Sequence, residues 1–215
     1  IFFAFEETLI YDLNFMGIKA GETILSIKKD TINQNNIYHL KSTTKTNSFV
    51  DKLYKIRDNI DILFNQKDFS TIEVIKKIDQ GGKRKLFKSI INYDSLKAIS
   101  NRKTIKIPGK VLDPLSSIYY LRNKEIKISD IFEFTTYDND KLKEVRVVAK
   151  NIETISTPNG DYECIVIVPE SKNGTLLKNK GSMKIWFSND ISKIPIKIEN
   201  ITKSGKMIML LKDIN

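Results

Sequence analysis

The sequence predicts an all-β protein, mainly antiparallel, built as one strongly curved sheet that forms an open or spiral barrel, with one short helix at about 113–122. Three observations favour this fold class. Apolar residues recur at every second position along most of the chain, as in half-buried strands. The connections between these segments are short and rich in Gly, Asn, Asp and Lys. Helical patterns are few, so the sheet has to bury its apolar face against itself.

The chain is long enough for one domain with a sizeable core. It has 215 residues, of which 40% are hydrophobic. No segment resembles a flexible linker, a low-complexity tract or a fixed-period repeat. We therefore expect a single β-rich domain over residues 1–215.

The first half of the chain reads as a meander of strands. "TLIYDLNF" places Leu9, Tyr11, Leu13 and Phe15 on one face. "DQGGKR" predicts a hairpin turn, because paired glycines permit positive φ angles. "SFVDKLYKI" fits a helical turn and a strand equally well and stays open. The remaining strand candidates of this half are "MGIKAGETILSIKKD", with Gly17 and Gly21 bracketing a bend, "NIYHLKSTTKT", "NIDILFN", "STIEVIKKID", "KLFKSIINYD" and "KAISNRKTIKI".

The second half continues the alternation after "DPLSSIYYLR", and the chain holds about twelve strands in all. "TPNGD" predicts another hairpin turn, "DNDK" a simple turn. The strand candidates are "DIFEFTTYD", "KLKEVRVVAKNIETIS", "DYECIVIVPE", "GSMKIWFSND", "IPIKIENI" and "KMIMLLKDI".

The helix at 113–122 is predicted from its start and its apolar stripe. Asp113 is a good N-cap, and Pro114 fits the first helical position, where no donor is missed. Leu115, Ile118 and Tyr119 then face one side and dock the helix on the sheet. We expect Arg122 to fix the end of the helix through a carboxylate or backbone carbonyls, close to the hairpin that carries Trp186.

A catalytic role for this helix finds no support in the sequence. Ser116 and Ser117 stand in its first turn, where serines bond to the backbone. A serine nucleophile needs an adjacent base, and the only histidine, His39, lies in an alternating strand. No nucleophile-elbow pattern surrounds either serine. The sequence therefore gives no catalytic residue.

Metal and cofactor sites are not expected either. Histidine and cysteine form no cluster, and the carboxylates are scattered rather than spaced as ligands. No glycine-rich loop precedes a helix to cradle a phosphate. A glycosidase-type pair of carboxylates from distant strands stays open, with Glu6, Glu22 and Asp190 as weak candidates.

The concave face of the sheet is the expected binding surface, and five residues are candidates either to line it or to support it. The stretch "MKIWFSNDISKIPIKIE" carries the sole tryptophan, Trp186, and then turns so that Pro195 begins the returning strand. Trp186 either lines a ligand cavity or fills the core, and core filling is favoured. The ligand-lining or structural candidates are Trp186, Tyr119, Arg122, Asp190 and Tyr11.

Charge and cysteine content bear on partner and compartment. The formal net charge of +10 points to an anionic partner or to a lysine-rich solvated surface, and lysines are spread along the whole chain rather than concentrated as in nucleic-acid modules.

The single cysteine, Cys164, lies in an apolar run and is expected to be buried. No apolar run reaches the roughly 18 residues of a spanning helix. "IFFAF" at the start is either the tail of a signal peptide or the beginning of a strand.

Three motifs carry a family resemblance. "YDLNFMGIKAGE", "DPLSSIYYLR" and "IWFSNDISKIPIKIE", in this order, resemble the bacterial envelope proteins grouped as domain of unknown function 3108. The resemblance spans nearly the whole chain. It implies an exported protein, periplasmic or envelope-associated, of a Gram-negative bacterium, with a β-rich fold and no assigned activity or catalytic residue. The curved sheet is also similar, by analogy of fold alone, to the unclosed barrels of periplasmic lipoprotein carriers.

Two functional hypotheses follow. The first is a non-catalytic binding or scaffold protein, without a cofactor, whose concave β surface holds a lipid, a cell-wall glycan or a segment of an envelope protein. The second is an envelope hydrolase acting on cell-wall glycan or peptide through strand-borne carboxylates. Nucleic-acid binding would explain the charge but neither the size nor the family resemblance, so no nucleic-acid partner is expected.

Overall fold

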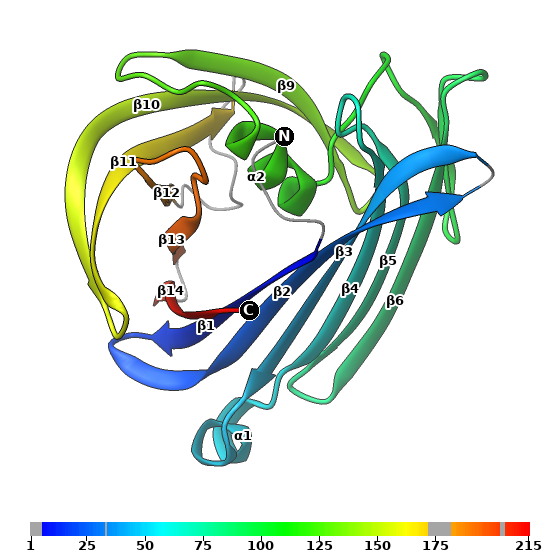
Figure 1. Ribbon diagram of the computed structural model, residues 1–215. Coiled ribbons are helices and arrows are strands. Elements are labelled where there is room, and N and C mark those ends of the chain that lie inside the picture. Colours follow the sequence, from blue (N-terminus) through cyan, green and yellow to red (C-terminus); the bar gives the residue numbers. More distant parts are fainter. Residues whose placement is uncertain (1–5, 33, 172–181, 203–204) are drawn as a thin grey trace.

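The fold is a single antiparallel sheet of fourteen strands that curls around a short helix (Figure 1). The computed structural model describes residues 6–32, 34–171, 182–202 and 205–215, so the "IFFAF" stretch lies outside the described residues. The sheet is strongly curved and unclosed, and the predicted fold class is confirmed.

The elements follow the alternating segments of the sequence. The first half contains β1 (Glu6–Phe15), β2 (Ile18–Ile32), β3 (Asn35–Thr46), α1 (Ser48–Tyr54), β4 (Arg57–Asn65), β5 (Thr71–Gln80), β6 (Lys83–Asn92), β7 (Lys97–Ser100) and β8 (Thr104–Lys106). The second half contains α2 (Pro114–Arg122), β9 (Ile131–Asp138), β10 (Lys141–Thr157), β11 (Gly160–Ser171), β12 (Ser182–Ser188), β13 (Pro195–Thr202) and β14 (Gly205–Ile214).

Two of the sequence predictions need correction. The described chain has two helices rather than one, because the ambiguous segment "SFVDKLYKI" contains α1. Asn47 caps this helix by accepting hydrogen bonds from the backbone N–H groups of Phe49 and Val50. The described residues form fourteen strands rather than about twelve.

The strands form two meanders that meet in the middle of the sheet. Strands β1 to β8 pair in sequence order in one direction, and β14 back to β9 pair in the other. The join is the antiparallel pairing of β1 with β14, in which Tyr11 lies opposite Leu211. The edge strands are therefore β8 and β9, which are close in sequence, and the chain between them contains α2.

Of the predicted turns, the one at Gly81 and Gly82 has the expected geometry, and the one at Gly17 and Gly21 needs correction. Gly81 and Gly82, between β5 and β6, both have positive φ angles. The predicted bend at Gly17 and Gly21 is a turn at Met16 and Gly17 only. Gly21 lies within β2, where a side chain would collide with the backbone carbonyl of Lys45 in β3. This glycine is needed for a close approach of two strands rather than for a turn.

The segment before α2 connects the edge strand β9 with β5, an inner strand of the other meander. The N–H of Leu112 donates to the carbonyl of Thr135 in β9 (3.0 Å), and the N–H of Thr71 in β5 donates to the carbonyl of Val111 (2.9 Å). Side chains add to this seam: the hydroxyls of Ser89 in β6 and Tyr137 in β9 are 2.8 Å apart. The segment thus bridges β5 and β9, with an isolated parallel bridge between Leu112 and Thr136.

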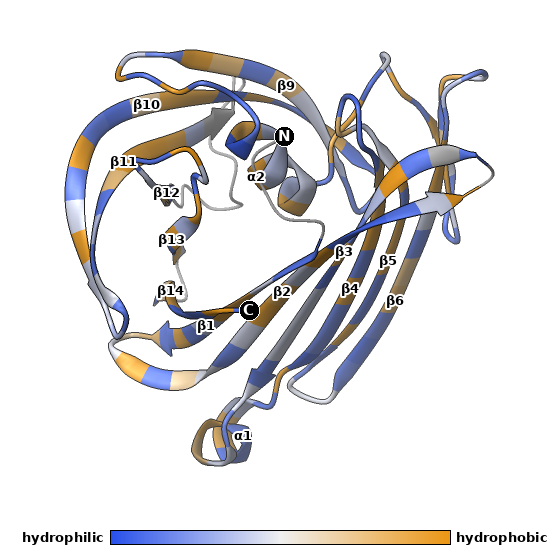
Figure 2. Cartoon of the chain, viewed as in Figure 1, coloured by the Kyte–Doolittle hydropathy of each residue, from blue (hydrophilic) through white to orange (hydrophobic). Residues whose placement is uncertain are grey.

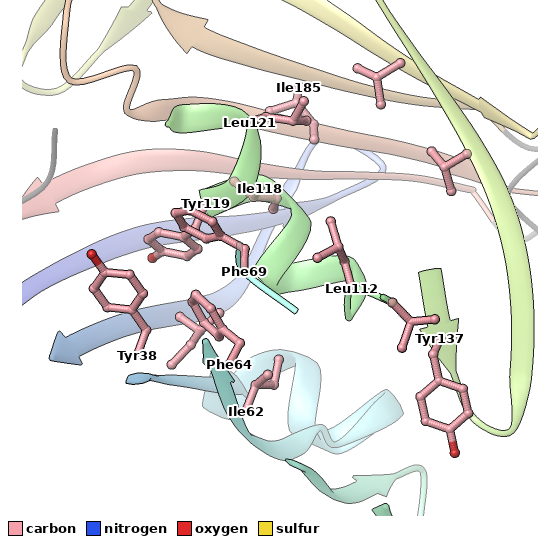
Figure 3. Close-up of a cluster of buried hydrophobic side chains, with 14 of the residues drawn as sticks. Tyr38, Ile62, Phe64, Phe69, Leu112, Ile118, Tyr119, Leu121, Tyr137 and Ile185 are labelled. Atoms are coloured by element: carbon pink, nitrogen blue, oxygen red, sulfur yellow. The ribbon is translucent and has the colours of Figure 1, made fainter. Parts of the chain in front are cut away.

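The core lies on the concave side and includes one face of α2. The alternation of hydrophobic and hydrophilic residues along the strands is visible in Figure 2. Figure 3 shows side chains of α2 meeting strand residues from both meanders. Tyr38, Phe64 and Phe69 form one aromatic group, with ring centroids 5.4 to 5.9 Å apart. Much of the concave face is therefore covered by the protein's own helix.

Candidate functional site

Helix α2 begins at a doubly bound aspartate. One carboxylate oxygen of Asp113 accepts a hydrogen bond from the N–H of Leu115 (2.8 Å), which is N-cap geometry. The other oxygen lies 2.8 Å from Nζ of Lys76 in β5. Pro114 follows as the first helical residue. The two serines use their hydroxyls as donors to backbone carbonyls: Ser116 to Asp113 and Ser117 to Pro114.

Lys76 connects the start of α2 with the far edge of the sheet. Its ammonium group is also 2.7 Å from a carboxylate oxygen of Asp138, at the end of β9. Burial alone would lower the pKa of Lys76, but the carboxylates of Asp113 and Asp138 outweigh it and raise the pKa above its usual value. Lys76 therefore stays charged and holds β5, β9 and α2 together.

The other end of α2 is fixed by a buried ion pair. Arg122 is fully buried, and its two terminal nitrogens donate to the two carboxylate oxygens of Glu7 in β1, at 2.6 and 2.8 Å. Its Nε donates to the carbonyl of Ser192, in the β12–β13 connection (3.2 Å). The prediction that Arg122 binds a carboxylate or carbonyls near the Trp186 hairpin is confirmed. Both kinds of acceptor are present.

Two tyrosines surround this ion pair. The guanidinium carbon of Arg122 lies 5.2 Å from the centre of the Tyr119 ring. The hydroxyl of Tyr11 donates to the carbonyl of Pro195, the first residue of β13 (2.8 Å). Burial raises the pKa of both phenols well above the usual value. Tyr11, Tyr119 and Arg122 thus form one buried polar cluster with Glu7.

Asp190 shapes the turn that supplies a carbonyl to Arg122. Its Oδ1 accepts hydrogen bonds from the hydroxyl of Ser188 (3.0 Å), from the N–H of Ser192 (2.8 Å) and from the N–H of Lys193 (3.1 Å). Burial tends to raise the pKa of Asp190, but these hydrogen bonds prevail and hold it below the usual value. The carboxylate of Asp190 thus stabilises the β12–β13 turn by accepting hydrogen bonds within it.

Trp186 belongs to a second cluster of buried residues, separate from the cluster around α2. It packs with Leu9, Tyr11 and Val166, and its indole N–H donates to Oε2 of Glu153 in β10 (2.7 Å). Nζ of Lys197 lies 4.2 Å from its ring centre. The five candidate residues all contact other residues of the protein, and these contacts give each of them a structural role. A ligand-lining role for them stays a prediction.

The weaker catalytic candidates are dispersed. Glu22 binds Lys45 and Lys212 on the surface of the sheet, and Glu6 is exposed at the start of β1. His39 in β3 lies beside Asp61 in β4, with 3.1 Å between Nε2 and Oδ1. Within the described residues, no group of three or more His, Cys, Asp or Glu side chains is arranged to hold a metal ion. In that same part of the chain no helix is long and apolar enough to cross a membrane.

A pocket opens beside the outer face of α2, at the end of the sheet where β4 ends and β9 begins. It has a volume of about 530 Å³, within the range of small-molecule sites. Its wall is aromatic: the ring of Tyr120 meets Phe69 at 6.1 Å and Phe134 at 5.5 Å, both edge to face. The lining residues are Lys67, Asp68, Phe69, Lys110, Leu112, Tyr120, Asn123, Lys124, Glu133, Phe134 and Thr135.

Three lysines give this pocket a positive rim. Nζ of Lys124 lies 4.6 Å from the centre of the Tyr120 ring. Lys110 is paired with Asp68 at 2.6 Å, and Lys67 is the third. Burial acts to raise the pKa of Asp68, but hydrogen bonds from Lys110 and Ser70 outweigh it and lower the pKa. The pocket therefore combines apolar rings with charged groups of both signs, the cations in excess.

Sequence reasoning missed this pocket. Its aromatic residues come from the β4–β5 loop, from α2 and from β9, which are far apart in sequence. Of the lining residues, Tyr120 lies in the stretch that the sequence singled out, and Leu112, Asn123 and Lys124 lie beside it. The signal that could have pointed there is Tyr120, which follows the docking residue Tyr119 and therefore lies at the side of the buried stripe.

Comparisons with known proteins find one matching family and similar solved structures. A family model described as "Protein of unknown function (DUF3108)" matches residues 10–212. No curated protein matches the chain. The crystal structure of a β-barrel-like protein of domain of unknown function DUF1849 from Brucella abortus is similar, with a TM-score of 0.67 and 11% identity over 98% of this chain and 97% of that chain. A structure described as a "putative lipoprotein" from Parabacteroides distasonis has a TM-score of 0.40 and 10% identity, over 99% and 96% of the two chains.

Proposed function

Because the chain belongs to the DUF3108 family of proteins of unknown function, we propose its role from its geometry: a non-catalytic binding protein of the bacterial envelope. Its ligand sits in the pocket between α2 and β9. The observation that carries the proposal is the combination of an aromatic wall with a rim of lysines in a pocket of about 530 Å³. Such a site suits an amphipathic anion, whose apolar body lies on the rings and whose negative group faces the lysines.

The position of the pocket supports a binding role for the curved sheet as a whole. Phe69 takes part in the pocket wall and also in the aromatic group of the core, with Tyr38 and Phe64. The pocket is thus the point at which the concave core reaches the surface. The rigid seam through Leu112 forms part of its lining, which provides a preformed site.

Asp68, at the rim of the pocket, is unsuited to the acid role in glycoside hydrolysis. A glycosidase-type general acid needs a carboxyl group whose pKa is raised. Asp68 has the opposite shift, because Lys110 and Ser70 bind its carboxylate. We therefore keep the binding role as the proposal.

An envelope location is part of the same proposal and rests on the family. The resemblance to exported DUF3108 proteins over nearly the whole chain supports it, and residues 10–212 match the family model. Fractionation of a Gram-negative host expressing the full-length protein is the direct check, with a periplasmic or membrane-associated location expected.

A fluorescence titration with anilinonaphthalene sulfonate tests the pocket. This dye joins an aromatic body to a sulfonate and so matches the proposed ligand chemistry. We expect saturable binding at one site, weakened about tenfold or more in Phe134→Ala and in Lys124→Ala. Lys97→Ala, at an exposed position on β7, is the matched control and should bind as the wild type does. Absence of saturable binding, or equal binding by all variants, would refute the site.

A further inference from the structure

Helix α1 has its amphipathic faces reversed relative to an ordinary surface helix. None of its residues is buried. Phe49 and Leu53, four residues apart, are 63% and 80% exposed, and Tyr54 is 51% exposed. Its one acidic residue, Asp51, instead turns toward the protein, where it accepts hydrogen bonds from Thr46 and Arg57. A helix on a globular surface normally buries the apolar stripe and exposes the charges.

The contacts that hold α1 on the sheet determine that its apolar side faces outward. The carboxylate of Asp51 is paired with both terminal nitrogens of Arg57, and the cap residue Asn47 donates its side-chain N–H to the carbonyl of Lys19 (2.7 Å). The ring of Tyr54 lies over Gly81, where a methyl group would come within 2.5 Å of it. Polar bonds thus hold the helix in place while its apolar side faces outward.

The hairpin of β1 and β2 exposes further apolar residues at the same end of the sheet. The N–H of Asn47 donates to the carbonyl of Ala20 (2.9 Å), which places the cap of α1 next to the beginning of β2. The β1–β2 turn exposes Phe15, Met16 and Ile18 at 43%, 63% and 58%. Figure 1 shows α1 projecting beyond the strand ends on this side of the sheet. We call the six exposed residues Phe15, Met16, Ile18, Phe49, Leu53 and Tyr54 the apolar rim.

Lysines flank the apolar rim. Lys52 and Lys55 are exposed within and directly after α1. On the next hairpin, beside Tyr54, Lys83 and Lys85 are exposed as well. Aromatic and aliphatic side chains interleaved with lysines are the composition of surfaces that insert into the headgroup region of an anionic bilayer.

We propose that the apolar rim docks the protein on an anionic lipid surface, with the side chains of α1 entering the headgroup layer. The flanking lysines contact the lipid phosphates. A second copy of the chain is the less suitable occupant, because a symmetric contact through α1 would bring the same lysines together. The rim is separate from the α2–β9 pocket, since β4 begins beside α1 and ends at the loop that lines the pocket.

Vesicle sedimentation tests this surface. We expect the full chain to bind vesicles of phosphatidylglycerol and phosphatidylcholine, to bind phosphatidylcholine alone at least about tenfold more weakly, and to lose affinity at about 0.5 M salt. Leu53→Glu should reduce binding about tenfold or more without changing the melting temperature, because the side chain is mostly exposed. The matched control is Ile191→Glu, which replaces a residue 68% exposed in the β12–β13 turn.

Three results would overturn the proposal. They are absence of binding to the anionic vesicles, equal binding by the wild type and Leu53→Glu, and equal loss of binding in Ile191→Glu. A dimer found by light scattering without vesicles and dissolved by Leu53→Glu would assign the apolar rim to a second copy instead. The dye titration of the α2–β9 pocket is independent of each of these outcomes and is expected to be unchanged in Leu53→Glu.

Discussion

Arg122 and Glu7 form the contact on which the position of α2 depends most directly. Both side chains are buried and joined by two hydrogen bonds. Removing one partner leaves a buried charge without compensation. We expect Arg122→Met to lower the free energy of unfolding by about 3–5 kcal/mol. Urea denaturation followed by tryptophan fluorescence measures it.

The double variant Glu7→Leu with Arg122→Met is the control for this prediction. It removes both charges, so it should recover a large part of the loss seen in the single variant. A single variant within about 0.5 kcal/mol of the wild type would contradict the role of the ion pair.

Cys164 should be chemically silent in the folded protein. Its side chain is buried, and burial raises the pKa of the thiol to about 11 from 9.0. The folded state therefore favours the neutral thiol. Its contribution to the free energy of unfolding is complete below about pH 9 and is lost as the pH rises toward 11. We expect iodoacetamide at pH 8.5 to modify the protein only in urea. Rapid labelling without urea, followed by mass spectrometry, would show the opposite.

At the level of elements, one carboxylate at the start of α2 makes two interactions that can be tested separately. Asp113 caps the helix with one oxygen and binds Lys76 with the other. Asp113→Ala removes both and should cost about 3–5 kcal/mol, because it leaves Lys76 with Asp138 alone. Asp113→Asn keeps a capping oxygen, so it should be less damaging by about 1 kcal/mol. Equal melting temperatures of the two variants would mean that the cap contributes nothing.

The alanine variant of Leu115 tests how much the least buried residue of the predicted docking side of α2 contributes to stability. Ile118 and Tyr119 are buried as predicted, whereas Leu115 is only partly buried. Leu115→Ala should therefore cost less than the 2–5 kcal/mol of a fully buried leucine. Thermal denaturation should place it between the wild type and Ile118→Ala.

The two helices differ in how far the sequence determines them. Helix α2 was predicted because its signals are local: a capping aspartate, a proline at the first position and an apolar stripe that becomes buried. Helix α1 is not determined by local signals, because its apolar residues fit a helical and a strand period equally well. Its outward apolar face could not have been predicted, since it depends on Arg57 and Thr46 binding Asp51 after the sheet has formed.

At the scale of the whole molecule, the sequence predicts the class of the sheet but not which distant segments come together in it. Alternating apolar residues indicate strands, and the lack of covering helices implies curling. The pairing of β1 with β14 and the seam through Leu112 join segments distant in sequence. The α2–β9 pocket depends on that seam, which brings Phe69, Tyr120 and Phe134 together. The candidate site is for this reason the part that the sequence predicts least.

The buried cluster and the pocket are contacted by neighbouring residues of the same helix. Tyr119 faces Arg122 inside the sheet, and Tyr120 faces the pocket. Any ligand in the pocket therefore rests on a helix that is anchored at its start by Lys76 and at its end by Glu7. We expect the pocket to be formed before ligand binding rather than created by it.

The most direct measurement is native mass spectrometry of the protein isolated from the envelope of an expressing bacterium. A bound amphipathic anion in the α2–β9 pocket predicts an added mass on the wild-type protein. That mass should be lost in Phe134→Ala and Lys124→Ala and kept in Lys97→Ala. A wild-type protein that carries no added mass, or a mass kept equally in all three variants, would contradict a binding role for this pocket.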